Sequence, residues 1–285
     1  MHLAEISPGS FRHRFPNRET DDEVGRTAAL IIPAQLTGPL KELILGSTYE
    51  FVLIAASFLA STMTATLGIG GGVLLLSVMA IFLPPVAIVP VHGVVLLVMS
   101  ATRGLFGFRH IQWRIPEQYL SGAIIGAALG SQFVTRVPPG LIPVLLGTFI
   151  LIVTWMPPIR TEAQVPFKFL WLGGVKTFLS LFVGATGPLL TPFVLREGLS
   201  RDEFVVTVAV LATISHVLKV TTFGLLGFSY APYMPLLAGM IIVVTFGSYL
   251  GTRLRGKAPE QLFRQAVKIL VTVLASRMII KVTLG

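Results

Sequence analysis

The chain has 285 residues, 53% of them hydrophobic and only 12% charged, and its mean hydropathy is +0.81. Because roughly a quarter of the residues in a soluble globular domain are charged, this composition excludes such a domain and indicates a polytopic membrane protein. The net charge of +9 would suit nucleic acid, but no soluble basic domain carries it, so nucleic acid is not expected as a partner.

The first 45 residues differ from the rest of the chain in composition. Basic and acidic side chains are mixed there, and the apolar stretch of a secretory signal peptide is missing. We therefore expect residues 1–45 to form a solvated N-terminal tail. The chain contains no cysteine, which excludes disulfides and thiol chemistry.

From Tyr49 onward the chain is a series of apolar segments separated by charged or proline-rich breaks. A membrane-spanning helix needs about 20 mostly apolar residues, and eight segments approach or exceed this length. They cover residues 49–83, 86–108, 117–136, 139–156, 168–195, 203–226, 231–252 and 261–283. The sequence therefore predicts an all-α polytopic membrane protein with about eight transmembrane helices.

Three motifs occur twice, in the same order. "GLFGF" at 104–108 returns as "GLLGF" at 224–228, and "GSQFVTR" at 130–136 returns as "GSYLGTR" at 247–253. In the same way "GIGGG" at 68–72 corresponds to "GATGP" at 184–188. The two copies of each motif are separated by nearly the same number of residues, which indicates a duplication. We expect two homologous four-helix transmembrane repeats, in residues 46–160 and 161–285.

The third motif interrupts the first apolar segment of each repeat. Each glycine weakens a helix by about 1 kcal/mol relative to alanine, and a broken helix survives in the bilayer only where it faces protein or a water-filled cavity. We expect this helix to be broken or re-entrant, with a second half-helix beginning at Gly71 or Gly72 and at Pro188. Such helix starts attract anions through their free N–H groups and the helix dipole.

Other glycines are expected only to pack helices closely. Gly122, Gly126 and Gly130 recur at four-residue spacing, and Gly247 and Gly251 do the same. Small residues at this spacing are typical of close helix contacts in membranes. We therefore assign these two groups to packing rather than to a binding site.

The predicted membrane segments contain bases in their middle parts but no acids. After residue 46, the acids all lie at segment ends; they are Glu50, Glu117, Glu162, Glu197, Asp202, Glu203 and Glu260. The bases and histidines inside the segments are His92, Arg103, Lys176, His216 and Lys219. Because a charge inside the bilayer is costly, such groups need a counter-charge, and an anionic substrate would supply one.

Helical periodicity places these groups on shared faces. His216 and Lys219 are three residues apart on one predicted helix, and His92 and Arg103 are eleven apart, which is close to three turns. A structural role is the competing interpretation. Arg103 and Lys176 can extend toward the interface, and either histidine can simply bond to a neighbouring helix. Lys219 lies deeper in its segment, which favours function.

Hydroxyl side chains near the second motif complete the candidate site. Thr186, Thr191, Thr213, Ser215 and Thr222 can donate to an anion or bond back to their own helix. No cofactor or metal is expected. The candidate substrate-binding residues are Gly70, Gly71, Gly72, His92, Arg103, Lys176, Thr186, Gly187, His216 and Lys219.

The repeated pattern of a glycine-rich break, in "GIGGGVLLLSV" and "GATGPLLTPFVLREGL", followed by a helix ending in Gly-x-x-Gly-Phe, resembles the TauE/SafE family of sulfite exporters, also called the toluene sulfonate uptake permease family. The resemblance covers most of residues 50–283. It implies an inner-membrane protein that moves sulfur-containing anions such as sulfite, sulfonates or sulfoacetate. By this resemblance the glycine clusters correspond to Gly68, Gly70, Gly71, Gly72, Gly184 and Gly187. The family more usually repeats "GxGGG", so "GATGP" departs from its pattern and makes the two half-sites unequal.

Other classes of function find less support in the sequence. An enzyme is not expected, because neither a "GxSxG" nor an "HExxH" motif is present. A membrane scaffold or assembly factor without transport activity is the alternative, in which the glycines only pack helices. The expected partners are a small sulfur oxyanion and the lipid bilayer, with a homodimer as an option.

Overall fold

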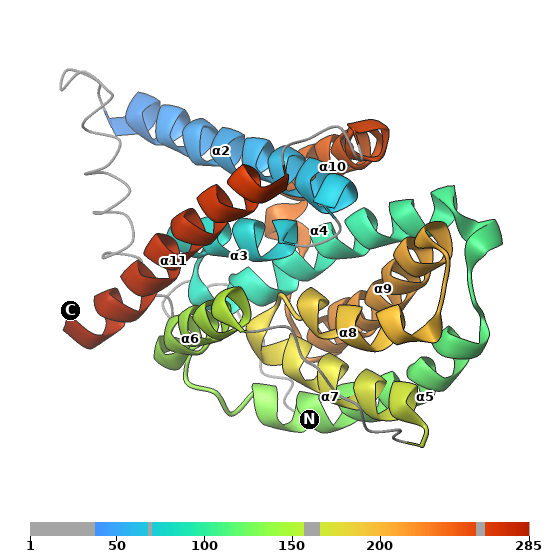
Figure 1. Ribbon diagram of the computed structural model, residues 1–285. Coiled ribbons are helices and arrows are strands. Elements are labelled where there is room, and N and C mark those ends of the chain that lie inside the picture. Colours follow the sequence, from blue (N-terminus) through green and yellow to red (C-terminus); the bar gives the residue numbers. More distant parts are fainter. Residues whose placement is uncertain (1–37, 68–69, 157–165, 255–259, 285) are drawn as a thin grey trace, which may run out of the picture. The chain divides into compact units, whose positions relative to one another are not determined.

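The computed structural model describes residues 38–67, 70–156, 166–254 and 260–284, and this part of the chain is helical without strands (Figure 1). Contacts divide the chain after Tyr49, and the unit of residues 50–285 is described by itself. Residues 1–37 of the predicted tail and Gly68 of the first motif lie outside the described residues. The helices are α2 (Gly38–Leu67), α3 (Gly71–Phe82), α4 (Pro85–Phe106), α5 (Arg114–Val134), α6 (Ile142–Trp155), α7 (Lys168–Val183), α8 (Thr191–Val194), α9 (Arg201–Leu225), α10 (Met234–Leu254) and α11 (Glu260–Leu284).

Four helices in the described part are long and apolar enough to cross a membrane. They contain the segments Thr48–Thr66, Pro85–Phe106, Arg201–Leu225 and Ala231–Leu254. The pair α5 and α6, bent by 118°, adds a fifth span if it is counted as one. This confirms that the described part of the chain is all-helical and contains membrane-compatible helices. The count of eight spans stays a prediction, because α3, α6 and α7 have only 12, 14 and 16 residues.

Helices α4 and α9 pack against each other in opposite directions. Near the start of α4, a Cβ atom added at Gly93 would lie 2.9 Å from the side chain of Lys219, close to the end of α9. Just beyond the other end of α4, Gly107 lies against Val206 near the start of α9. We call the end of the bundle where α4 starts and α9 finishes end A, and the opposite end end B.

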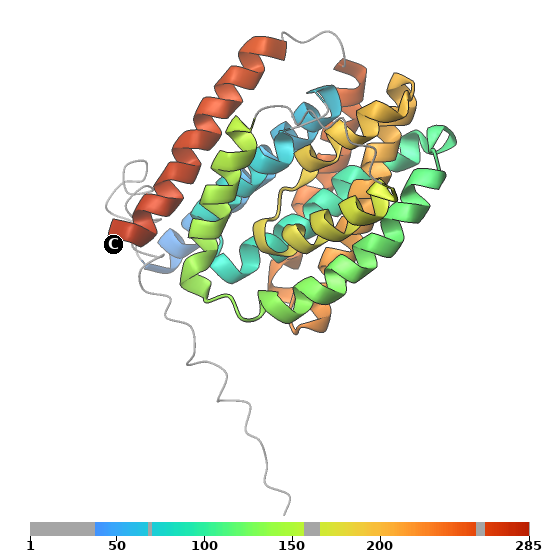
Figure 2. The same cartoon turned by 60° about the horizontal axis from the view of Figure 1, so that its bottom comes forward.

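The segment from α7 to α8 is a hairpin that enters the bundle from end B and returns to it. α7 runs beside α5 in the same direction (Figures 1 and 2), and α5 begins at end B, just after α4. Lys168 at the start of α7 and Glu197 after α8 form an ion pair. The two ends of this segment therefore lie together at end B, and the tip between them lies inside the bundle.

The segment from α2 to α3 is a second hairpin. Gly71, the first residue of α3, lies against the backbone carbonyl of Ala60 and the side chain of Thr64 in α2, so α3 folds back along α2. α3 then leads directly into α4, which starts at end A. The two hairpins consequently enter the bundle from opposite ends, as re-entrant elements.

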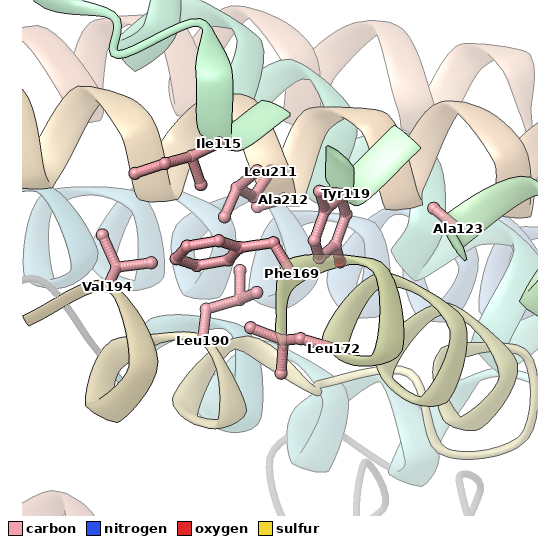
Figure 3. Packing of buried hydrophobic residues seen from close by; sticks show 9 residues of the cluster. All are labelled: Ile115, Tyr119, Ala123, Phe169, Leu172, Leu190, Val194, Leu211 and Ala212. Atoms are coloured by element: carbon pink, nitrogen blue, oxygen red, sulfur yellow. The ribbon is translucent and has the colours of Figure 1, made fainter. Parts of the chain in front are cut away.

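A buried apolar cluster anchors the second hairpin to α5 and α9 (Figure 3). Phe169 of α7 lies at its centre, between Leu190 before α8 and Leu211 of α9. Tyr119 of α5 and Val194 of α8 close the cluster on either side. Because these side chains come from four elements, their burial fixes both arms of the hairpin against the bundle.

Local sequence signals set where α9 begins. Gly198 has φ +67°, a left-handed conformation that glycine adopts without strain. Ser200 then caps α9: its side chain accepts from the backbone N–H of Glu203, and the Glu203 carboxylate accepts from the N–H of Ser200. This reciprocal pair is the capping box that starts many helices.

The prediction that a half-helix begins at Pro188 is wrong. In place of one regular half-helix, the chain forms three short helical pieces, namely the 3₁₀ turn η3 (Gly187–Leu189), the four-residue helix α8 and the 3₁₀ turn η4 (Leu195–Glu197). Pro188 and Pro192 follow each other at short distance, and each lacks the backbone N–H that a continuing helix needs. The second hairpin therefore returns through an irregular arm, whereas the first returns through the regular helix α3.

The glycines assigned to packing do pack helices. Gly122 and Gly126 of α5 face the backbone carbonyls of Leu170 and Gly174 in α7 so closely that no side chain fits. Gly130 lies against α7 as well, and Gly247 and Gly251 of α10 lie against α2. The small-residue prediction is confirmed for both groups, and it explains why α5 and α7 approach so closely.

Candidate functional site

The first break lies where the glycine motif predicts it. α2 ends at Leu67 and α3 begins at Gly71, which confirms that the second half-helix starts at this residue. Gly70 has φ +99°, a conformation that side chains rarely allow. Because the first N–H groups of a helix have no partner within it, α3 presents donors and the positive end of its dipole at the tip of the hairpin.

The second break is a tight turn at Gly184. This residue has φ +75° and ψ −60°, and the N–H of Ala185 donates to the carbonyl of Val183 at 2.8 Å. Such a three-residue turn is rare and strained. A Cβ atom at Gly184 would lie 3.0 Å from Leu76 of α3 and 3.3 Å from Nδ1 of His92. The turn of the second hairpin therefore packs against the middle of α3 and the first part of α4.

A cavity of about 70 Å³ lies between the two hairpin tips, and we call it the basic cavity. Its walls include Gly70 and Gly72 from the first break, Gly187 from the second, and the side chains of Arg103 and His216. Its volume is well above the roughly 10–15 Å³ that one water molecule needs, so a small oxyanion fits. No carboxylate is among the residues that line it.

Lys219 is fully buried and holds the second break. Its Nζ donates a hydrogen bond to the carbonyl oxygen of Gly184 at 2.8 Å. A backbone carbonyl thus partners this lysine by a hydrogen bond, whereas the counter-charge expected from an anionic substrate stays a prediction. The carbonyl groups at the C-terminal end of a helix carry the negative end of its dipole. The ammonium group of Lys219 therefore interacts favourably with the C-terminal end of α7.

His92 is fully buried as well and holds the first break. Its Nε2 lies 2.8 Å from the carbonyl oxygen of Gly72. Because a carbonyl only accepts, Nε2 carries the hydrogen, and Nδ1 of a neutral ring is then an acceptor. Nδ1 is buried, has no hydrogen-bond partner among the described residues, and faces Gly184.

Three further candidate residues carry buried polar atoms without a hydrogen-bond partner in the described part of the chain. They are Nζ of Lys176, Oγ1 of Thr186 and Nδ1 of His216. Lys176 and Thr186 are completely buried, and His216 is 5% exposed. His216 lines the basic cavity, and Thr186 stands between the lining residues Ala185 and Gly187. Because more than nine in ten buried polar groups in proteins have a partner, these two atoms indicate a place for a polar ligand.

The basic side chains named from the sequence act on one another electrostatically. His216 lies close enough to Lys219, Lys176 and Arg103 for their charges to disfavour a charged imidazole. Arg103 lies in the last turn of α4, lines the basic cavity, and donates from Nε to the carbonyl of Met99 at 3.2 Å. The described residues contain no group of three or more His, Asp or Glu side chains that could hold a metal ion.

Ser215, named from the sequence as a possible donor, belongs to a hydroxyl network whose other two members, Tyr119 and Thr177, the sequence analysis did not name. Tyr119 of α5 is fully buried, and its OH lies 2.6 Å from Oγ of Ser215. Ser215 also lies 3.0 Å from Oγ1 of Thr177, the neighbour of Lys176. Tyr119 stands three residues before Gly122 in a helix of small residues, and that isolated polar ring was the available signal. Thr213 only bonds back to the carbonyl of Ala209.

The comparison with protein families agrees with these features. The family described as "Sulfite exporter TauE/SafE" matches residues 53–278, a range that contains both breaks and every candidate binding residue. No curated protein and no solved structure matches the chain. Because the family match spans most of the sequence, the chain belongs to the sulfite exporter TauE/SafE family.

Proposed function

We propose that the protein is a transporter, and specifically an exporter, of small sulfur-containing anions such as sulfite, sulfonates or sulfoacetate. Membership of a family of membrane transporters supports transport rather than catalysis. The apolar helices support an integral membrane protein, which we assign to the cell inner membrane. The anion binds in the basic cavity between the two breaks.

This proposal rests on three unpaired buried groups, of which His216 lines the cavity and Thr186 stands between the lining residues Ala185 and Gly187. Nζ of Lys176, Oγ1 of Thr186 and Nδ1 of His216 have no hydrogen-bond partner in the described part of the chain. An unpaired buried polar group costs about 1–3 kcal/mol, so its retention needs a reason. A sulfur oxyanion offers several acceptor oxygens, and charge-assisted bonds to them are about twice as strong as neutral ones.

The residues divide into two roles. Lys176, Thr186, Arg103 and His216 bind the anion through their side chains. Gly70, Gly71, Gly72 and Gly187 let the backbone approach it; a Cβ at Gly187 would meet nothing within 4 Å, so this glycine borders open space. Lys219 and His92 hold the two breaks through the carbonyls of Gly184 and Gly72, and so position the backbone around the anion.

We also propose that the two halves are inverted repeats. Each half begins with a re-entrant hairpin and continues with three helices, α4 to α6 in one and α9 to α11 in the other. A hairpin enters and leaves the membrane on the same side, so each half crosses the membrane three times. Because three is an odd number, the second half begins on the opposite side and has the opposite orientation. The repeated sequence motifs support this, since "GLFGF" and "GLLGF" coincide with the ends of α4 and α9. Inverted repeats with broken helices are common in secondary transporters.

The experiment is flux of radiolabelled sulfite in proteoliposomes under nitrogen, with wild-type protein, His216→Ala and Lys268→Ala. Lys268 is exposed on α11 and is not among the residues that line the cavity, so it is the control. We expect saturable flux for wild type and for Lys268→Ala, and at least a tenfold loss for His216→Ala. Flux that is equal in all three proteins would contradict the assigned site.

The alternative, a membrane scaffold or assembly factor, makes a different prediction in the same assay. Its glycines would only pack helices, as Gly122 and Gly126 do, and no sulfur oxyanion would cross. Correctly folded protein that gives no flux of sulfite, sulfate or a sulfonate would favour this alternative.

A further inference from the structure

A second and larger cavity lies beyond the hairpin tips, toward end A. Its volume is about 390 Å³, and its inner wall includes Pro90 of α4, Phe182 of α7 and Phe223 of α9. We call it the apolar cavity, because nearly all its lining side chains are hydrocarbon. Neither the family match nor the proposed binding site gives it a role.

Two helices run from one cavity to the other, and each places a basic residue between them. On α4 and on α9 alike, residues toward end A line the apolar cavity and residues toward end B line the basic cavity. The order from end A to end B is Pro90, His92 and Leu96 on α4, and Phe223, Lys219 and His216 on α9.

The second hairpin shows the same order independently. Phe182 lines the apolar cavity, Ala185 lines the basic cavity, and Gly184 lies between them. Gly184 is the residue whose carbonyl accepts from Nζ of Lys219. Three separate elements thus cross a single layer, made of His92, Gly184 and Lys219, in which both side chains are fully buried.

The two cavities extend toward opposite ends of the bundle. The outer wall of the apolar cavity includes Pro85, Pro139 and Gly227, which lie at the start of α4, after α5 and after α9, at end A. The basic cavity extends to Arg103 in the last turn of α4, toward end B. Each cavity therefore extends from the shared layer toward its own end.

We propose that the two cavities are the two halves of one path through the membrane, and that Lys219 and His92 form the barrier between them. This inference rests on the proposed function. For an anion to pass, the ammonium group of Lys219 must release the carbonyl oxygen of Gly184 and donate to an oxygen of the anion instead. This exchange opens the layer. The hydrocarbon walls of the end A half offer an anion no binding partner, so this half only conducts the anion, and the layer alone closes the path.

The chain contains no cysteine, so a single introduced thiol reports its own accessibility. We would compare Val89→Cys in the apolar cavity, Thr191→Cys in the basic cavity and Val217→Cys as control. Val217 is 43% exposed on α9 and lines neither cavity. Each variant is reconstituted and treated with a membrane-impermeant anionic thiol reagent from one side of the bilayer and then from the other.

We expect Val89→Cys and Thr191→Cys to be modified from opposite sides, and Val217→Cys from neither. Adding Lys219→Met to Val89→Cys removes the barrier and should raise its modification from the end B side at least tenfold. Modification of both cavity positions from the same side would overturn the proposal. So would reaction of Val89→Cys with membrane-permeant reagents only, since the cavity would then open to lipid.

Two additions keep the outcome decisive. Phe223→Cys and Met99→Cys report on the same two cavities if the first variants do not fold. Labelling needs no substrate, so it separates the two claims. Labelling from opposite sides without sulfite flux would contradict the assignment of the substrate and support the path. Labelling from the same side with intact sulfite flux would contradict the path and leave the substrate assignment standing.

Discussion

Nζ of Lys219 lies 2.8 Å from the carbonyl oxygen of Gly184 and donates to it, although 35 residues separate the two in sequence. The bond joins α9 to the tip of the second hairpin, and both residues belong to the layer between the cavities. A buried lysine that is satisfied by a helix end differs physically from one that is not. Lys176, equally buried, has no such partner among the described residues.

This difference predicts opposite effects of the same substitution at the two lysines. Lys176→Met removes an unpaired buried amine, so we expect it to stabilise the fold by roughly 1–3 kcal/mol, the cost of such a group. Lys219→Met leaves the carbonyl of Gly184 unpaired, so this substitution should not increase the stability of the fold. Thermal unfolding in detergent, followed by the fluorescence of the three tryptophans, checks the order of the two Tm values. A lower Tm for Lys176→Met than for Lys219→Met would contradict the assignment.

Gly184→Ala should destabilise the protein, because its φ of +75° is strained for any side chain. The strain amounts to about 1–3 kcal/mol, and the new methyl group would also press on Leu76 at 3.0 Å. Gly140→Ala is the matched control, since a Cβ there meets nothing within 4 Å, and it should change stability by less than about 0.5 kcal/mol. Equal unfolding temperatures for the two variants would show that the turn at Gly184 does not exist.

The packing of α5 on α7 offers a matched pair of alanine substitutions. A Cβ at Gly126 would fall on the backbone carbonyl of Gly174, so Gly126→Ala must push the helices apart and should cost about 1–3 kcal/mol or more. A Cβ at Gly174 comes only to 3.4 Å from the carbonyl oxygen of Gly122, an ordinary contact. Gly174→Ala should therefore be tolerated, with a gain in helix propensity of up to about 1 kcal/mol. Yield and Tm after purification distinguish the two, and a more stable Gly126→Ala would refute this packing.

The sequence predicted the features whose signals are local and consist of residues that are unusual in a membrane-spanning helix. Glycine runs marked the breaks at Gly70 and Gly184, and a base without a nearby acid marked Lys219 as buried. Four-residue glycine spacing likewise predicted that the helix of Gly122 and Gly126 packs closely on another helix, without indicating which one. Each signal is rare in an apolar helix, so a single sequence was sufficient to find it.

Other features depend on packing between distant segments and could not be predicted. The partner of Lys219 is a backbone carbonyl, which carries no sequence signature. The apolar cavity is lined by residues such as Phe182 and Phe223, which are ordinary in membrane helices. The irregular return arm after Gly187 was misjudged, because Pro188 suits a helix start but Pro192 soon follows it.

The central claim is that a sulfur oxyanion binds between the two hairpin tips. Its most direct test is to locate selenite, an anomalous scatterer close to sulfite in charge and shape, in crystals of the full chain. The account predicts an anomalous peak in the basic cavity, with its oxygens at about 2.7–3.2 Å from Nζ of Lys176 and a ring nitrogen of His216. A peak confined to the protein surface, or an empty cavity at saturating selenite, would contradict it.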